Sequence, residues 1–172
     1  MIISKRPPYS STIADPDRTK AQIDKLLRQY GINEFQWTNT QLQTVLAFKA
    51  ETEINGQRRT LLIKVEPPLF VSARRTWDET RGRYEKKDLP NYAQSYRLLY
   101  HWLKAKIEAI AYGLTSVEQE FLSQVVVSLP GGESRTIGEI LTDPQRLARF
   151  ALEDKEPQSA PTTKNESKEK EP

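Results

Sequence analysis

The sequence predicts an α+β fold, in which helices and an antiparallel sheet occupy separate stretches of the chain. Three patterns indicate it: an amphipathic helix near the start, two alternating runs joined at an Asn-Gly pair, and a long helix after them. The chain has 172 residues, the size of one domain with tails. We expect an extended lead-in at residues 1–16, a single domain at 17–152 and a disordered charged tail at 153–172.

The first helix is predicted to begin at Thr19, because Thr19 and Gln22 have the spacing of a capping box. Apolar side chains then recur three and four residues apart and form one stripe, made of Ile23, Leu26, Leu27 and Tyr30. Gly31 follows and supplies the left-handed conformation with which helices commonly end. This stretch is therefore predicted to be an amphipathic helix that buries one face.

Asn55-Gly56 lies between two alternating runs, which is a strong signal for a hairpin with a two-residue turn. The turn sets a register in which apolar residues of the two runs share one face: Ala50 with Leu61, Phe48 with Ile63, and Leu46 with Val65. A slip of one residue would bring Lys49 and Lys64 into the core. The hairpin is therefore predicted in this register, with its other face in water.

Phe35 and Trp37 predict a further strand before the hairpin, which completes a three-stranded antiparallel meander. Pro67-Pro68 ends the third strand, since proline cannot donate a hydrogen bond to a sheet. Residues 72–90 show no hydrophobic period and are rich in charge. They are predicted to form a long loop, a feature that in compact domains is usually functional or disordered.

The longest helix is predicted after Pro90 and is apolar around most of its circumference. Its first stripe is Tyr96, Leu99, Leu103, Ile107, Ile110 and Leu114, and its second is Leu98, Trp102, Ala105 and Ala109. Its narrow polar face is Gln94, Arg97, His101, Lys104 and Glu108. We expect this helix to be central and to pack on the sheet.

The C-terminal part is predicted to contain a small helix, a strand and another small helix. Two pairs with capping-box spacing predict the helix starts, Thr115 with Glu118 and Thr136 with Glu139. Residues 125–129, Val-Val-Val-Ser-Leu, are mostly apolar and β-branched, which favours a strand. Asp143-Pro144 predicts a last helical turn or two after these elements.

The composition argues against most enzyme classes. No cysteine is present, which excludes thiol catalysis and cysteine zinc sites. The single histidine, His101, lies between Arg97 and Lys104 on the polar helix face and is expected to be a surface residue. Lys64 resembles the lysine of metal-dependent nucleases, but Leu62 stands where their metal-binding acid belongs. We therefore expect no catalytic residue, no metal, no cofactor and no enzymatic activity.

A concentration of basic residues marks the middle of the chain. Residues 58–107 carry twelve basic and five acidic side chains, although the net charge of the whole chain is only +3. Aromatic rings interleave with the cations in the predicted loop, a mixture that suits phosphates and unpaired bases, although four acidic residues dilute it. The candidate nucleic-acid-binding residues, in the loop and on the outer face of the hairpin, are Arg58, Lys64, Arg74, Arg75, Trp77, Arg81, Arg83, Tyr84, Lys86 and Lys87.

A second candidate surface lies on the long helix, where Leu98 and Trp102 belong to the second apolar stripe. If that stripe is accessible in the isolated domain, it suits a protein partner or a second copy of the chain. No apolar run is long enough to cross a membrane, and the first residues lack the apolar core of a signal peptide. We therefore expect a cytoplasmic protein with no membrane partner.

Residues 18–31, Arg-Thr-Lys-Ala-Gln-Ile-Asp-Lys-Leu-Leu-Arg-Gln-Tyr-Gly, resemble the K-T-x-x-[QE]-I-x-x-L-L-x-x-[YH]-G start of a family of small phage, prophage and mobile-element proteins. Residues 96–107, 117–127 and 136–141 resemble later phrases of the same family in the same order. Departures are Tyr96 in place of tryptophan, Ser123-Gln124 in place of Pro-Tyr, and the long basic stretch 72–90. The resemblance implies a mobile-element origin and no particular activity.

Two functions of different classes remain open. The first is a non-enzymatic accessory protein of a phage or mobile element, acting in the cytoplasm of a bacterial or archaeal host. It would bind a protein partner or associate with itself through Leu98 and Trp102. The alternative is a nucleic-acid-binding protein that uses residues 72–90 and the outer face of the hairpin.

Overall fold

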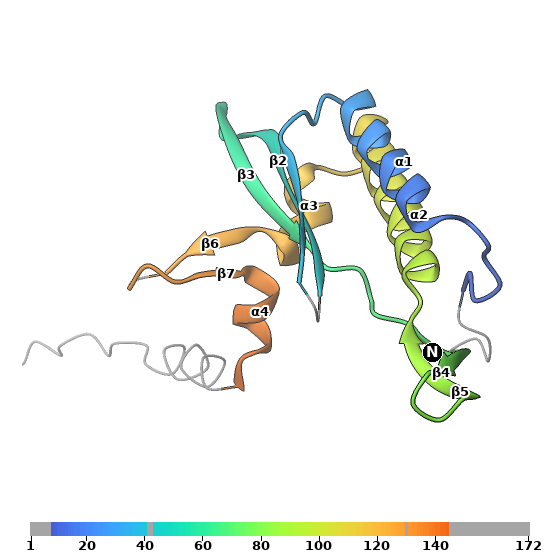
Figure 1. The fold of residues 1–172 in the computed structure, drawn as a ribbon. Helices are drawn as coiled ribbons and strands as arrows, with labels where there is room; N and C mark the ends of the chain where they lie inside the picture. Colours follow the sequence, from blue (N-terminus) through green and yellow to red (C-terminus); the bar gives the residue numbers. More distant parts are fainter. Residues whose placement is uncertain (1–7, 41–42, 130, 145–172) are drawn as a thin grey trace, which may run out of the picture.

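The computed structural model describes residues 8–40, 43–129 and 131–144. It confirms the α+β class, with a three-stranded sheet between a pair of helices and a small C-terminal unit (Figure 1). The elements are α1 (Pro16–Gln29), β1 (Phe35–Asn39), β2 (Thr44–Ile54), β3 (Gln57–Val65), β4 (Val71–Asp78), β5 (Arg83–Pro90), α2 (Tyr92–Ala111), α3 (Val117–Phe121), the 3-10 helix η1 (Leu122–Gln124), β6 (Val126–Ser128), β7 (Ser134–Thr136) and α4 (Ile137–Thr142).

The three-stranded sheet has the order β1-β2-β3 and is antiparallel throughout. The predicted hairpin register is confirmed, since Phe48 pairs with Ile63 and Leu46 with Val65. Its turn residues both have positive φ angles, 52° at Asn55 and 73° at Gly56, which is the conformation that a two-residue hairpin turn of this type requires. The local turn chemistry therefore determines which face of the sheet is buried.

The core lies between the apolar face of this sheet and the helices α1 and α2, which run side by side across it (Figure 1). Phe48 and Ile63 of the sheet, Leu27 of α1 and Leu103 of α2 are almost completely buried. Phe121 of α3 completes this cluster, and its ring meets that of Phe48 edge-on with centroids 5.6 Å apart. The prediction that the long helix packs centrally on the sheet is confirmed.

The start of α1 differs from the prediction, because the helix begins at Pro16 instead of Thr19. The Asp15 carboxylate accepts hydrogen bonds from the backbone N–H groups of Asp17 and Arg18, at 2.7 and 3.4 Å. Aspartate at the N-cap followed by proline is a stronger start signal than a capping-box spacing three residues later. The lead-in predicted at 1–16 therefore stops at Asp15, and its first seven residues lie outside the described part of the chain. Its described part is not extended throughout, because residues 8–11 form a turn in which the backbone N–H of Thr12 donates to the carbonyl of Tyr9 at 3.0 Å.

Residues 72–90 do not form the predicted loop. They belong to the antiparallel hairpin β4–β5, and Asp78 starts its turn by accepting hydrogen bonds from the backbone N–H groups of Thr80 and Arg81. Gly82 completes the turn with a φ of 56°. The hairpin has no alternating apolar pattern because its aromatic-bearing face is exposed and its other face, although half-buried, consists mostly of polar side chains such as Ser72, Thr76 and Glu85.

The long helix ends earlier than its apolar stripe suggested. It stops at Ala111, and Gly113 follows in the left-handed conformation with φ of 71°. As a result Leu114 is 81% exposed. The prediction that Leu114 belongs to the buried stripe of the long helix is therefore wrong. Gln94, expected on the polar face, is buried and its amide donates to the carbonyl of Pro8 at 2.8 Å.

The small C-terminal unit is as expected in outline but differs in detail. The capping box of α3 is formed by Ser116 with Gln119, one residue after the predicted pair, whereas Thr136 and Glu139 cap α4 as predicted. Strand β6 pairs with a second short strand, β7, which was not predicted from the sequence. Residues 145–172, including the predicted last helix and the charged tail, lie outside the described residues.

Candidate nucleic-acid interface

The β4–β5 hairpin extends from the end of the molecule at which α2 begins (Figure 1). Strand β5 leads directly into the helix, and the backbone N–H of Asn91, the N-cap of α2, donates to the carbonyl of Phe70 at 2.7 Å. This hydrogen bond closes the base of the hairpin just before β4. The hairpin is therefore anchored at its base, while its turn points into solvent.

Strand pairing sorts the hairpin residues onto two faces. Partners across an antiparallel pair share a face, and successive residues alternate between faces. Trp77 pairs with Tyr84 and Arg75 with Lys86, so these four residues lie together on one face. We call it the aromatic face; it also carries Val71, Ala73, Asp88 and Pro90.

The rings of Trp77 and Tyr84 pack edge-on with centroids 5.1 Å apart, yet the residues remain 54% and 67% exposed. Arg75 and Lys86 are also exposed, and neither has an ion pair within the part of the chain that the structure describes. The aromatic face thus offers two rings and two cations to solvent, with one carboxylate, that of Asp88, nearer the base of the hairpin.

The opposite face of the hairpin is electrostatically different. Arg81 and Arg83 both bind the Glu85 carboxylate, with N–O distances of 2.8 and 2.9 Å. The hydrogen bond from Arg81, followed by that from Arg83, holds the pKa of Glu85 below its ordinary value. Arg74 pairs across the strands with Lys87 on this face. Two of the predicted binding arginines are therefore engaged within the hairpin itself.

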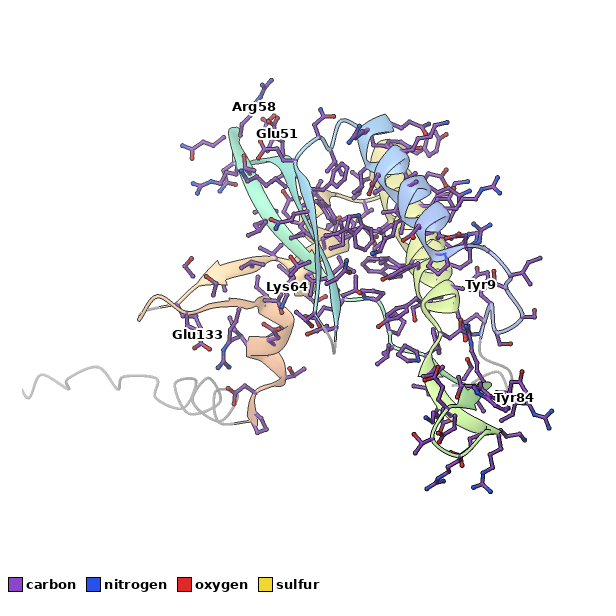
Figure 2. All side chains as sticks on the ribbon, viewed as in Figure 1. Tyr9, Glu51, Arg58, Lys64, Tyr84 and Glu133 are labelled. Carbon is purple, nitrogen blue, oxygen red and sulfur yellow. The ribbon has the colours of Figure 1, made fainter. Side chains whose placement is uncertain are left out.

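Arg58 and Lys64 do not join this surface. Figure 2 places Arg58 at the β2–β3 turn, at the opposite end of the molecule from Tyr84. Lys64 binds Glu66 at 2.9 Å and lies 3.9 Å from Glu139, and the hydrogen bond to Glu66 is the main reason that its pKa is raised. The predicted combined surface of residues 72–90 and the outer hairpin face is not formed.

The second candidate surface is largely covered. Leu98 and Trp102 are both half-buried, and the Trp102 ring meets Phe121 edge-on with centroids 5.8 Å apart. The Lys106 ammonium lies 5.0 Å from the centre of the Trp102 ring and is itself held by Glu120 at 2.6 Å. These contacts make Trp102 part of the packing between α2 and α3.

His101 is half-buried and packs against another aromatic ring. Its ring stacks on Tyr9, with centroids 4.9 Å apart and planes 8° from parallel. Burial lowers the pKa of His101, and the nearby charges of Arg97 and Lys104 lower it further. Within the described ranges, no group of three or more His, Asp or Glu side chains is arranged to hold a metal ion.

No helix in the described part of the chain is both long enough and apolar enough to cross a membrane.

Comparisons with protein-family models, with curated proteins and with solved structures found no match to this chain. The resemblance to phage and mobile-element proteins therefore stays a prediction. The fold and the site define an α+β protein with a projecting hairpin, one face of which combines Arg75, Trp77, Tyr84 and Lys86.

Proposed function

We propose that the protein binds single-stranded nucleic acid through the aromatic face of the β4–β5 hairpin. The observation that carries the proposal is the exposed Trp77–Tyr84 pair beside Arg75 and Lys86, two exposed cations that have no ion pair with any described residue. Exposed aromatic rings accept stacked bases of any sequence, and arginine and lysine bind phosphates.

The spacing within the hairpin supports this combination. Successive pairs on one face of a hairpin lie about 7 Å apart, since each residue advances roughly 3.3 Å along a strand. A base stacked on Trp77 or Tyr84 would thus leave its backbone phosphate within reach of Arg75 or Lys86. Stacking of this kind needs unpaired bases, which favours single strands over a duplex.

The affinity for nucleic acid should fall moderately as the salt concentration rises. If Arg75 and Lys86 each neutralise one phosphate, the slope of log affinity against log salt concentration will be about −1.4 on a single strand. Fluorescence anisotropy of labelled oligo-dT and oligo-U, measured over a series of salt concentrations, gives this slope. Failure of both oligonucleotides to bind at low salt would contradict the proposal.

A protein partner on the same face is the second candidate, because Val71 and Trp77 are both more than half exposed there. Association driven by apolar burial depends little on salt, unlike binding to phosphates. The salt series therefore separates the two candidates. In either case the resemblance to mobile-element proteins supports the role of a phage or mobile-element accessory protein.

A further inference from the structure

A pocket lies at the other end of the molecule, where α1 and α2 both end. It has a volume of about 530 Å³, within the range typical of small-molecule sites. Its apolar lining comes from the link after α1, from the last turns of α2 and from α3, and includes Ile32, Ile107, Ile110, Val117 and Phe121. No residue of the β4–β5 hairpin lines it.

The charged residues that line the pocket are Glu34, Lys49 and Glu51. Lys49 is bound to Glu34, with 2.6 Å between ammonium nitrogen and carboxylate oxygen. Glu51 is exposed and has no ion pair within the described ranges. The rim therefore carries one negative charge in excess.

The helix ends add to this negative potential. Tyr30 and Gly31, directly after α1, and Ala111, the last residue of α2, all line the pocket. The C-terminus of a helix carries a partial negative charge that favours cations. The last turn of α2 contains no basic residue, and Arg28 in the last turn of α1 lies over the ring of Phe35, 5.4 Å from its centre, outside the pocket lining.

We infer that this pocket binds a small amphipathic cation, namely a primary amine on an aliphatic or aromatic body. The apolar lining receives the body of the ligand, and its ammonium group lies at the rim near Glu51 and the two helix ends. An anion of the same shape meets the Glu51 carboxylate and two negative helix ends, and Lys49, the cation among the described residues of the pocket lining, is already bound to Glu34. The site thus selects by charge as well as by apolar burial.

Three probes with the same body test the charge selection: 4-phenylbutylamine, 4-phenylbutan-1-ol and 4-phenylbutyrate, titrated at pH 7 and followed by protein NMR. The amine should bind about tenfold more tightly than the carboxylate, with the alcohol between them. Amide shifts at Gly31 and Ala111 should accompany amine binding. Equal binding of amine and carboxylate, or no binding of any probe, would overturn the inference.

A pair of matched variants locates the cation. Glu51→Gln should weaken amine binding several-fold and leave alcohol binding unchanged, because it removes only the unpaired charge at the rim. Glu53→Gln is the control, since Glu53 lies on the same strand and the same face but does not line the pocket. Both residues are exposed, so neither change disturbs the core. Equal affinities of the two variants for the amine would place the ammonium elsewhere and refute the assignment.

Discussion

Replacing Phe48 with alanine will lower the free energy of unfolding by about 3–5 kcal/mol. Phe48 is 1% exposed and touches Phe121 within the cluster that joins the sheet to α1, α2 and α3. Its removal takes away apolar burial and leaves a cavity that the surrounding elements fill only in part. Such a loss is a large share of the total stability of a domain of this size. Urea unfolding followed by far-UV circular dichroism measures it.

Glu53→Ala provides the control for this prediction, because Glu53 lies on the same strand but on its solvent-facing side. A surface change of this kind should alter the unfolding free energy by less than about 0.5 kcal/mol. If Phe48→Ala were no less stable than Glu53→Ala, the register of β2 against β3 described above would be wrong.

The second large effect is on binding. Trp77→Ala should weaken the affinity for single-stranded oligonucleotides by about 1–3 kcal/mol, the usual value for losing one base-stacking aromatic. Trp77 is more than half exposed on a hairpin outside the main core, so the unfolding free energy of the domain should change little. Fluorescence anisotropy at low salt measures the affinity, and urea unfolding of the same variant checks the stability.

Tyr112→Ala serves as the matched control for an exposed aromatic, since Tyr112 is 78% exposed just after the end of α2, far from the hairpin in sequence and structure. This variant should bind as the wild type does. Trp77→Phe should retain part of the affinity, because a ring remains available for stacking. A Trp77→Ala variant with wild-type affinity would contradict the proposal that a base stacks on Trp77.

Local turn chemistry explains why the three-stranded sheet could be predicted. Asn55-Gly56 fixes the turn, the turn fixes the register, and the register decides that Phe48 and Ile63 face the helices. Each step depends only on neighbours in sequence, so every predicted pair of this hairpin is found. The start of α1 was misplaced for a related reason, since Asp15 and Pro16 outweigh the capping-box spacing at Thr19.

The second hairpin was missed because hydrophobic alternation reports burial of one strand face. In β4–β5 the aromatic face is exposed and the half-buried face consists mostly of polar side chains such as Ser72, Thr76 and Glu85, so backbone pairing leaves no hydrophobic alternation. The signal that was present is the turn closed by the Asp78–Arg83 pair, which is flanked directly by Trp77 on one side and Tyr84 on the other. An aromatic pair placed symmetrically about a turn is typical of a cross-strand pair.

The residue types of the candidate site could be predicted from the sequence, but their arrangement could not. Sequence alone places six cations within residues 72–90 without saying which of them share a face. The hairpin register separates Arg75 and Lys86 from Arg74 and Lys87. Composition and charge counts do not show this separation. The separation defines the surface through which the protein is proposed to bind nucleic acid.

The hairpin itself provides the most direct test of the proposed function, because it carries one arginine–lysine pair on each face. The double variants Arg75→Gln/Lys86→Gln and Arg74→Gln/Lys87→Gln remove the same charge from the same two strands. They differ only in the face that loses it. Any effect of net charge alone is therefore equal in the two proteins.

Anisotropy of labelled oligo-dT across a salt series should show a large loss of affinity for Arg75→Gln/Lys86→Gln, with a salt slope near zero. The Arg74→Gln/Lys87→Gln variant should stay within about twofold of the wild type and keep a slope of about −1.4. Equal losses in the two variants, or a greater loss in the second, would contradict binding through the aromatic face.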